Sequence, residues 1–462
     1  MFDAKTYVQR RRRLAKDLRS GLVLLLGNDD VPMNYPANPF HFRQDSTFLY
    51  FFGLDSPGLA AVIDIDEGRD ILFGDDIDIE DIIWMGFLPT LKERAGQVGV
   101  KDARPMKSLA EVLAEAAAKG RMIHFLPPYR AEHSLKLDAL LGLRPAQAPS
   151  KISPALVDAV IRQRSVKTDE EVAEMETALR TTYKMYETAM RMAQPGVYEK
   201  DIVGRIDGLA IADGGSTAFP TILTMDGQIL HNHSHLQKLA KGRLLVVDSG
   251  AESSRHYAGD ITRTIPVGGK FSARQRVIYE LVLSANVNAI KAIKPGLIYK
   301  DIHLQAAKTI AAGLKNLGLM KGDTDEAVKQ GAHALFFPHG LGHMIGLDVH
   351  DMENLGEKNV GYDKSVDRSD QFGLAYLRMA KALQPGYVLT VEPGCYFIPA
   401  LIDKWKAEKK HLDFIAYDKV EKYRDFGGIR IEDNVLVTPA GRRVLGKPIP
   451  KKAEEVEAAV QF

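Results

Sequence analysis

The sequence predicts an α+β fold with two related halves over residues 165–450, preceded by a smaller α/β domain over residues 1–160. Two repeats support this fold class. Residues 241–250, KGRLLVVDSG, match residues 385–394, PGYVLTVEPG, and this match places Asp248 on Glu392. A nine-residue pattern, QPGVYEKDI at residue 194, recurs as KPGLIYKDI at residue 294. The 462 residues also exceed what one hydrophobic core usually supports, so two domains are expected.

The first 160 residues alternate short apolar runs with helical patterns. Strands are expected over residues 22–26, 60–65 and 71–73, and a helix is expected over residues 109–118. The aromatic residues 48–52 should be buried. The four arginines at residues 10–13 are expected to form a solvated helix face, and residues 151–168 are expected to link the domains.

Each half of the repeat contains a long helix that ends at a Pro-Gly pair. The first helix should start after Thr168, which is spaced with Glu171 as a capping box, and stop before Pro195. The second should run from Ser272 to Pro295. The predicted apolar faces are Val172, Met175, Leu179, Tyr186 and Met190 in the first helix, and Val277, Leu281 and Ala285 in the second. Each strand repeat is a β-branched run closed by glycine, which predicts a buried strand that ends at a turn.

The composition is ordinary for a globular protein and argues against several classes. With 61 basic and 60 acidic residues, the net charge is +1, so neither nucleic acid nor an anionic membrane is expected as a partner. The single cysteine, Cys395, excludes an intramolecular disulfide framework and a thiolate-rich zinc site, and a buried, inert thiol is expected. No apolar run is long enough for a signal peptide or a membrane span, so a cytoplasmic protein is expected.

Five side chains of metal-ligand type stand in chain order: Asp248, Asp260, His343, Glu392 and Glu432. The spacing of the two aspartates suits neighbouring strands joined by a tight turn, and Glu432 lies in an alternating pattern typical of a strand. Each residue alone is better explained as a turn former or a core residue, so the prediction rests on the five together. This oxygen-rich set favours Mn(II), with Co(II), Fe(II) or Zn(II) as alternatives, and four acids suit two ions rather than one.

The segment HGLGHMIGLDVHD, residues 339–351, is the most specific motif in the chain. With it, the sequence resembles the pita-bread metallopeptidases, the group that contains methionine aminopeptidase, aminopeptidase P and prolidase. The other motifs of that group, DxG, DxTR, TVEPG and GxRIED, stand in order at residues 248–250, 260–263, 390–394 and 428–433. The resemblance implies a pita-bread (creatinase/aminopeptidase) catalytic domain with an internal pseudo-twofold repeat, and the N-terminal domain resembles that of the proline-specific branch. The interval between the two aspartates is one residue longer than usual, which a longer turn can absorb.

The resemblance implies a role for each metal ligand. Asp248 would bind one of two divalent ions, and Asp260 and Glu432 would bridge both ions. His343 and Glu392 would complete the second site. Glu392 would also move a proton between the attacking water and the leaving nitrogen.

Further site residues are implied around the metal ligands. His350 would stabilise the oxyanion and, with His231, contact the substrate, and His339 would also line the cleft. Thr262 and Arg430 would orient the bridging carboxylates.

The implied substrates are small peptides with proline at the second position, and a homodimer is the implied assembly. Arg378 aligns with an arginine that captures the C-terminal carboxylate of dipeptides in prolidases, so an Xaa-Pro dipeptidase is favoured. Long insertions over residues 351–383 and 399–425 should build a site wall or a subunit contact, and the second resembles prolidase. The alternative is an Xaa-Pro aminopeptidase acting on longer peptides. A non-enzymatic binding protein of the same fold, or a metal-independent creatinase-type hydrolase, is disfavoured because all five metal ligands are present.

Overall fold

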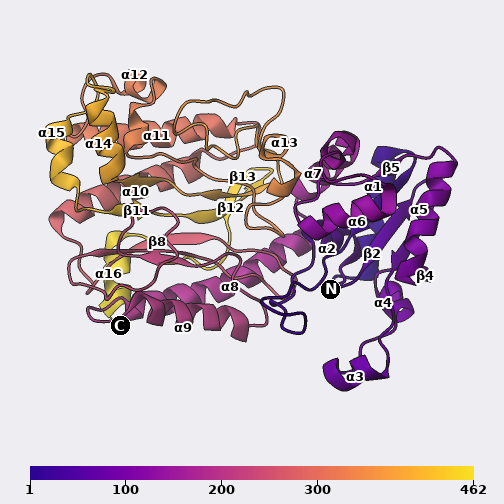
Figure 1. Cartoon of the computed structure of the whole chain (residues 1–462). Helices are drawn as coiled ribbons and strands as arrows, with labels where there is room; N and C mark the ends of the chain where they lie inside the picture. The colour runs from indigo at the N-terminus through magenta and orange to yellow at the C-terminus, as the bar shows by residue number, and fades with distance from the viewer. Residues whose placement is uncertain (462) are drawn as a thin grey trace. The chain divides into compact units, whose positions relative to one another are not determined.

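The computed structural model describes residues 1–461 and divides into two compact units (Figure 1). Unit 1 comprises Met1–Arg164 and Met352–Gly356, and unit 2 comprises Ser165–Asp351 and the described residues from Glu357 onward. Every helix within the described residues is too short or too polar to traverse a lipid bilayer.

A mixed five-stranded sheet forms the centre of unit 1, in the order β4-β3-β2-β1-β5. Its strands are β1 (Leu22–Leu26), β2 (Ala60–Asp64), β3 (Arg69–Phe73), β4 (Asp102–Arg104) and β5 (Ile123–His124). Its helices are α1 (Ala4–Leu18), α2 (Ser46–Phe52), α3 (Ile79–Met85), α4 (Leu91–Gln97), α5 (Leu109–Ala118), α6 (Ala131–Leu141) and α7 (Pro154–Ser165), the last within the predicted linker. Leu22 and Val62 of the sheet share one core with Leu113 of α5 and Leu137 of α6. The predicted strands and the helix over residues 109–118 are confirmed, and the aromatic residues 48–52 are buried as part of α2.

The prediction of a solvated arginine face on α1 is wrong for two of its four residues. Arg10 and Arg11 are only 7% and 1% exposed. Arg11 Nε donates to Asp70 Oδ2 at 2.7 Å, and its other two nitrogens donate to the carbonyl oxygens of Phe51 and Val98. The helical period turns these two arginines inward, and burial is tolerated because acceptors satisfy the guanidinium N–H groups of Arg11.

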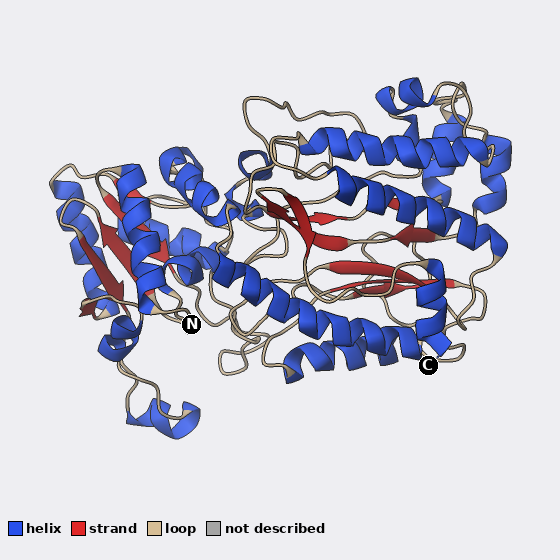
Figure 2. Ribbon diagram, turned by 180° about the vertical axis from the view of Figure 1, so that it is seen from behind, coloured by secondary structure: helices blue, strands red, loops and turns tan. Residues whose placement is uncertain are grey.

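Unit 2 contains two halves, each with a pair of long helices followed by strands. The first half has α8 (Asp169–Met192), α9 (Glu199–Ala212), β6 (Ile222–Thr224), β7 (Leu244–Ser249) and β8 (Ile261–Pro266). The second has α10 (Ala273–Ala292), α11 (Tyr299–Asn316), α12 (Thr324–Lys329), α13 (Glu357–Gly361), β9 (Val388–Val391), β10 (Gly394–Tyr396), α14 (Pro399–Ala407), α15 (Tyr417–Val420), β11 (Gly428–Arg430), β12 (Asp433–Thr438), β13 (Gly441–Val444) and α16 (Ala453–Gln461). Helices α8 and α9 lie along one side of the strands, and α10 and α11 lie along the opposite side (Figures 1 and 2). The strands pair as β6-β7-β8, β13-β12-β9 and β10-β11.

Capping boxes start both long helices at the predicted positions. Thr168 caps α8 with Glu171, and Ser272 caps α10 with Gln275. The apolar face predicted for α8 is buried. The face predicted for α10 is right for Ala285, which is buried, but wrong for Val277, which is 47% exposed, and Leu281 is only half-buried. The buried stripe runs through residues 278, 282, 285 and 289. Apolar residues lie on more than one face of α10, so packing against the strands decides which face is buried.

The nine-residue repeat forms the same turn in both halves. Gly196 and Gly296 adopt φ values of 96° and 83°, in the left-handed region that favours glycine. Two residues later, Tyr198 and Ile298 each form an isolated antiparallel bridge, and a helix follows. The repeat is therefore present in the backbone as well as in the sequence.

The sequence predicted that Glu432 lies within one alternating strand, and this prediction is wrong. Strand β11 pairs with β10, β12 pairs with β9, and Ile431 and Glu432 lie between the two strands. All residues from 428 to 435 are buried, so this segment has no solvent face. Cys395 in β10 is fully buried, as expected, and burial raises the pKa of its thiol.

Candidate metal centre

Each half of unit 2 places two acids at one end of a strand pair. Asp248 lies near the end of β7, and Asp260 directly precedes β8, the antiparallel partner of β7. Glu392 directly follows β9, and Glu432 directly precedes β12, the antiparallel partner of β9. The end of one antiparallel strand lies beside the start of its partner. The repeat therefore delivers a pair of carboxylates from each half.

His343 is held by hydrogen bonds to strand β9. Its N–H donates to Thr390 Oγ1 at 3.0 Å, and its carbonyl oxygen accepts from the Thr390 N–H at 2.9 Å. Its Nδ1 lies 3.0 Å from the carbonyl oxygen of Met344. Because a carbonyl only accepts, Nδ1 carries the hydrogen and the lone pair is on Nε2. Nε2 lies 3.4 Å from Asp260 Oδ2 and 3.6 Å from Glu392 Oε1.

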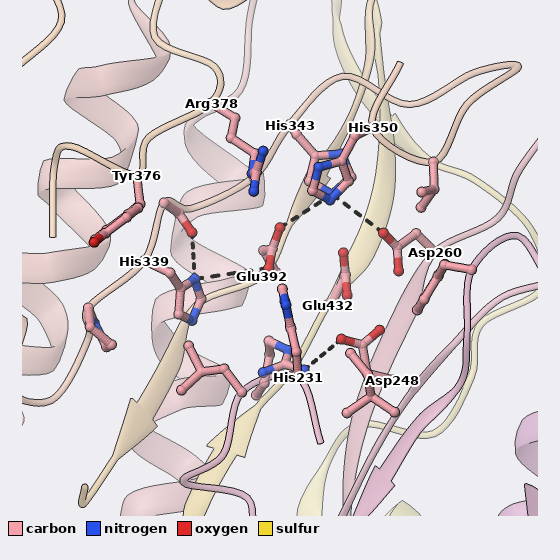
Figure 3. Close-up of a pocket in the computed structure, with 18 of the residues that line it drawn as sticks. His231, Asp248, Asp260, His339, His343, His350, Tyr376, Arg378, Glu392 and Glu432 are labelled. Atoms are coloured by element: carbon pink, nitrogen blue, oxygen red, sulfur yellow. Dashed lines mark hydrogen bonds and ion pairs between the residues drawn. The ribbon is translucent and has the colours of Figure 1, made fainter. Parts of the chain in front are cut away.

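The structure brings all five predicted ligands to one cleft of about 570 Å³ (Figure 3). Ligand atoms of Asp260, His343 and Glu432 all lie within 4.8 Å of one another. Asp248 and Glu392 line the same cleft as these three residues. The spacing suits metal binding, and the two remaining acids suit a second ion.

The buried carboxylates fit a divalent cation. Oδ1 of Asp248, Oδ1 of Asp260 and Oε1 of Glu432 are buried and accept no hydrogen bond from the described residues. Burial, together with neighbouring acids, raises the pKa of Asp260 and of Glu432. Burial also raises the pKa of Glu392, to about 7. Ionised acids are costly in such a place without a counterion, and their unpartnered oxygens are suitable metal ligands.

The two residues expected to orient the carboxylates both contact the site. Thr262 Oγ1 donates to Glu432 Oε2 at 2.7 Å. Arg430 Nη2 donates to Asp248 Oδ2 at 2.6 Å, and its Nε donates to Thr262 Oγ1 at 3.1 Å. Arg430 therefore contacts Asp248 directly and reaches Glu432 only through Thr262. The family resemblance had implied that Arg430 orients the bridging carboxylates, Asp260 and Glu432.

The three other predicted histidines line the same cleft. The ring of His350 lies 3.9 Å from that of His343 between centroids. Nδ1 of His339 lies 4.0 Å from Glu392 Oε2, and burial lowers the pKa of His339 to about 3. Burial also lowers the pKa of His231. His339 and His231 are therefore neutral near pH 7 and add no charge that would repel a cation.

Part of the first predicted insertion forms a wall of the cleft. Phe372, Tyr376 and Arg378 line it. The Arg378 side chain is 36% exposed, and its Nη1 lies 3.7 Å from Glu357 Oε2. Because Arg378 lines the cleft, its guanidinium is positioned to contact an anionic ligand there.

Sequence reasoning missed two residues that contact the site. The Tyr396 hydroxyl accepts from Arg430 Nη1 at 2.9 Å and lies 2.9 Å from His339 Nε2. The Thr390 hydroxyl donates to Glu392 Oε1 at 3.2 Å. Both lie within four residues of Glu392, but that proximity alone does not reveal which hydroxyl turns toward the cleft.

Comparisons with known proteins agree with this site. The model of metallopeptidase family M24 matches residues 173–439, and that of the aminopeptidase P N-terminal domain matches residues 7–124. An Xaa-Pro dipeptidase from Homo sapiens is 30% identical over 97% of this chain and 92% of its own length. A probable Xaa-Pro aminopeptidase from Aspergillus fumigatus is 32% identical over 96% of this chain and 95% of its own length.

Solved structures match the whole chain. Aminopeptidase P from E. coli, bound to the inhibitor Pro-Leu, has 29% identity and a TM-score of 0.81, with 100% of this chain and 99% of that chain covered. The predicted fold class, a pita-bread catalytic domain with a smaller N-terminal domain, is confirmed. The chain belongs to metallopeptidase family M24.

Proposed function

We propose that this protein is a two-metal peptidase that hydrolyses the bond before proline, with Xaa-Pro dipeptides as preferred substrates. The observation that carries the proposal is the meeting of four carboxylates and one imidazole in one cleft, with three buried carboxylate oxygens left without hydrogen-bond partners among the described residues. The names of the human and fungal relatives support specificity for Xaa-Pro bonds.

Two divalent ions would be held by the five residues Asp248, Asp260, His343, Glu392 and Glu432. A set of four carboxylates and one imidazole suits Mn(II), with Co(II), Fe(II) or Zn(II) as alternatives. When bound, such ions would polarise a scissile carbonyl and lower the pKa of a bound water.

Glu392 is the acid best placed to move a proton. Its side chain is 18% exposed to the cleft, against 6% for Asp260, so a bound peptide can approach it. It would take a proton from the attacking water and return it to the prolyl nitrogen. His350, on the same cleft, would donate a hydrogen bond to the developing oxyanion, and His339 and His231 would contact the peptide.

Specificity for proline is compatible with this cleft. The Xaa-Pro bond is a tertiary amide without an N–H group, so a site that needs that hydrogen cannot recognise it. The proposed centre acts on the carbonyl side of the bond. Phe219, Leu230 and Val349 line the cleft and offer apolar surface for a pyrrolidine ring.

Arg378 supports dipeptidase activity, because a dipeptide presents its C-terminal carboxylate close to the scissile bond. Arg378→Ala should raise KM for Ala-Pro at least about tenfold, the loss expected for a charge-assisted hydrogen bond, and change KM for Ala-Pro-Ala little. Arg368→Ala is the matched control, because Arg368 pairs with the same Glu357, at 2.8 Å, but does not line the cleft. Equal KM values for Arg378→Ala and the wild type on Ala-Pro would exclude the carboxylate contact.

The second candidate is an Xaa-Pro aminopeptidase. Its support is the full-length match to E. coli aminopeptidase P in complex with substrate, at 29% identity and a TM-score of 0.82. Faster release of alanine from Ala-Pro-Ala than from Ala-Pro, with no effect of Arg378→Ala, would favour this activity.

We also propose a cytoplasmic homodimer. Helix α3 and the residues after it expose Ile79, Ile83, Trp84, Met85 and Phe87 by 69–83%. Neighbouring exposed apolar side chains of this size are typical of a protein interface. A single buried thiol is compatible with a reducing compartment. Light scattering should give the mass of a dimer, and a monomer at all concentrations would contradict the proposed assembly.

A further inference from the structure

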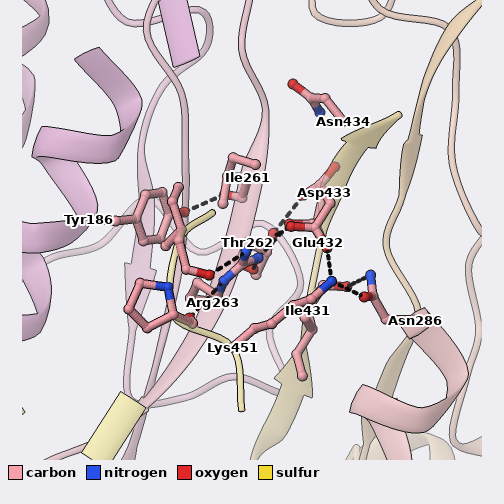
Figure 4. Close-up of polar contacts among 12 residues, drawn as sticks. Tyr186, Ile261, Thr262, Arg263, Asn286, Ile431, Glu432, Asp433, Asn434 and Lys451 are labelled. Atoms are coloured by element: carbon pink, nitrogen blue, oxygen red, sulfur yellow. Dashed lines mark hydrogen bonds and ion pairs between the residues drawn. The ribbon is translucent and has the colours of Figure 1, made fainter. Parts of the chain in front are cut away.

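Each half of unit 2 sends one buried polar side chain from its first long helix to the strand ends that carry the acids. Tyr186 on α8 and Asn286 on α10 are 1% and 0% exposed. They occupy equivalent positions in the repeat, because each stands eight residues before its copy of the nine-residue pattern, 186 before 194 and 286 before 294. In Figure 4, Tyr186 reaches Ile261, and Asn286 lies beside the segment of Ile431.

Tyr186 holds the backbone next to both aspartates of the first half. Its single O–H hydrogen is shared between two carbonyl oxygens, that of Val247, at 3.0 Å, and that of Ile261. Val247 directly precedes Asp248, and Ile261 directly follows Asp260. The same hydroxyl accepts, at 3.2 Å, from the N–H of the residue after Asp248. One oxygen atom thus ties together the two chain segments that present the aspartates.

Asn286 does the same for the glutamates of the second half. Its Nδ2 donates to the carbonyl oxygen of Val391 at 2.9 Å and to that of Ile431 at 3.3 Å. These residues directly precede Glu392 and Glu432. One amide group thus ties together the two chain segments that present the glutamates.

Lys451 fixes the orientation of this amide. Its Nζ donates to Asn286 Oδ1 at 2.9 Å and to Asp433 Oδ2 at 2.6 Å (Figure 4). An ammonium group cannot accept and a carbonyl cannot donate, so only one orientation of the amide satisfies all three contacts. Arg263 donates to Asp433 Oδ1 at 2.8 Å and to the carbonyl oxygen of Glu432 at 2.6 Å. The support behind the glutamates is therefore a connected network, in which Asn286, Arg263 and Asp433 are buried and Lys451 is half-buried.

We propose that Tyr186 and Asn286 are paired positioning residues of the metal centre, each holding the peptide group before a metal-binding acid. Tyr186 binds the carbonyl oxygen of Val247, and Asn286 binds that of Val391. These two carbonyl groups are equivalent, because Val247 and Val391 match in the strand repeat. Both side chains act through the backbone, so no motif of metal ligands includes them. This inference depends on the metal centre of the proposed function, and it does not depend on the proposed substrate.

The test measures the affinity of metal-free protein for Mn(II) by titration against a competing chelator. Tyr186→Phe removes only the hydroxyl, and Asn286→Leu replaces the amide by an apolar group of similar shape. Each should weaken binding about ten- to hundredfold, the usual loss when a group that orients metal ligands is removed. Tyr183→Phe on α8 and Asn288→Leu on α10 are matched controls at less buried positions of the same helices, and they should bind Mn(II) like the wild type.

The outcomes separate positioning from general stability. Weaker Mn(II) binding in variants whose metal-free thermal midpoint stays near the wild-type value supports positioning. Wild-type affinity in folded Tyr186→Phe overturns it, whether or not the thermal midpoint falls, and this variant decides the matter if Asn286→Leu fails to fold. A wild-type protein that binds Mn(II) but cleaves no Xaa-Pro peptide would remove the proposed substrate and leave the positioning roles standing. A wild-type protein that binds no divalent ion would overturn both.

Discussion

The metal-free protein should become less stable as the pH rises from acid to neutral. In the metal-free protein, burial raises the pKa of Glu392 to about 7, with repulsion from Asp260 acting in the same direction. The unfolded chain releases this proton near its ordinary pKa of about 4.3. Between these two values the folded state binds more protons than the unfolded state, so the free energy of unfolding falls with pH. The fall is absent below about pH 4 and complete above about pH 7.

The size of the effect follows from the two pKa values. One pKa unit corresponds to about 1.4 kcal/mol, so Glu392 alone should cost on the order of 3–4 kcal/mol of stability above neutral pH. Its side chain is 18% exposed, so solvent screens only part of this cost. Asp260 and Glu432, whose pKa values are also raised, act in the same direction.

Urea denaturation of metal-free protein at several pH values between about 5 and 8 measures this slope. Glu392→Gln should show a shallower fall, while Glu408→Gln, which alters an exposed acid of unit 2, should follow the wild type. Adding Mn(II) should remove most of the fall, since bound cations favour the ionised acids. A wild-type stability that is constant or rises over this range, or an equal slope in Glu392→Gln, would refute the reasoning.

Three further outcomes are expected. Tyr396→Phe removes the hydroxyl beside His339, so kcat should fall about ten- to hundredfold while the fold is retained. An unchanged kcat in steady-state assays would argue against a role for this contact. Arg11→Met should lower the free energy of unfolding of unit 1 by about 3 kcal/mol in denaturation experiments, because it removes a buried guanidinium that pairs with half-buried Asp70. Arg12→Met, at an exposed position, should have little effect. Cys395 should resist alkylation by iodoacetamide until the protein unfolds, and mass spectrometry that finds it modified in the native protein would contradict its burial.

Elements with strong local signals were predictable from the sequence. The capping residues Thr168 and Ser272 mark helix starts through side-chain contacts three residues away, and β1 follows from an unbroken apolar run. The strand repeat also predicted that Asp248 and Glu392 end equivalent strands. These features depend on neighbours in sequence, or on a duplication that is itself visible in the sequence.

Features decided by long-range packing were not predictable. The inward turn of Arg11 depends on Asp70, and the buried face of α10 depends on which side meets the strands. Asn286 carries no motif, and its role depends on carbonyl groups more than a hundred residues away, such as that of Val391, 105 residues along the chain. The break between β11 and β12 at Glu432 likewise reflects two different pairing partners.

Hydrolysis of an Xaa-Pro dipeptide by metal-loaded protein tests the proposed chemistry most directly. Mn(II)-loaded protein should release alanine from Ala-Pro and leave Ala-Leu intact. Metal-free protein and Asp260→Asn, which alters one of the three clustered ligands, should be inactive. Equal cleavage by the metal-free protein, or by Asp260→Asn, would contradict the metal centre. If the metal-loaded protein cleaved neither Ala-Pro nor Ala-Pro-Ala, the proposed specificity would be contradicted.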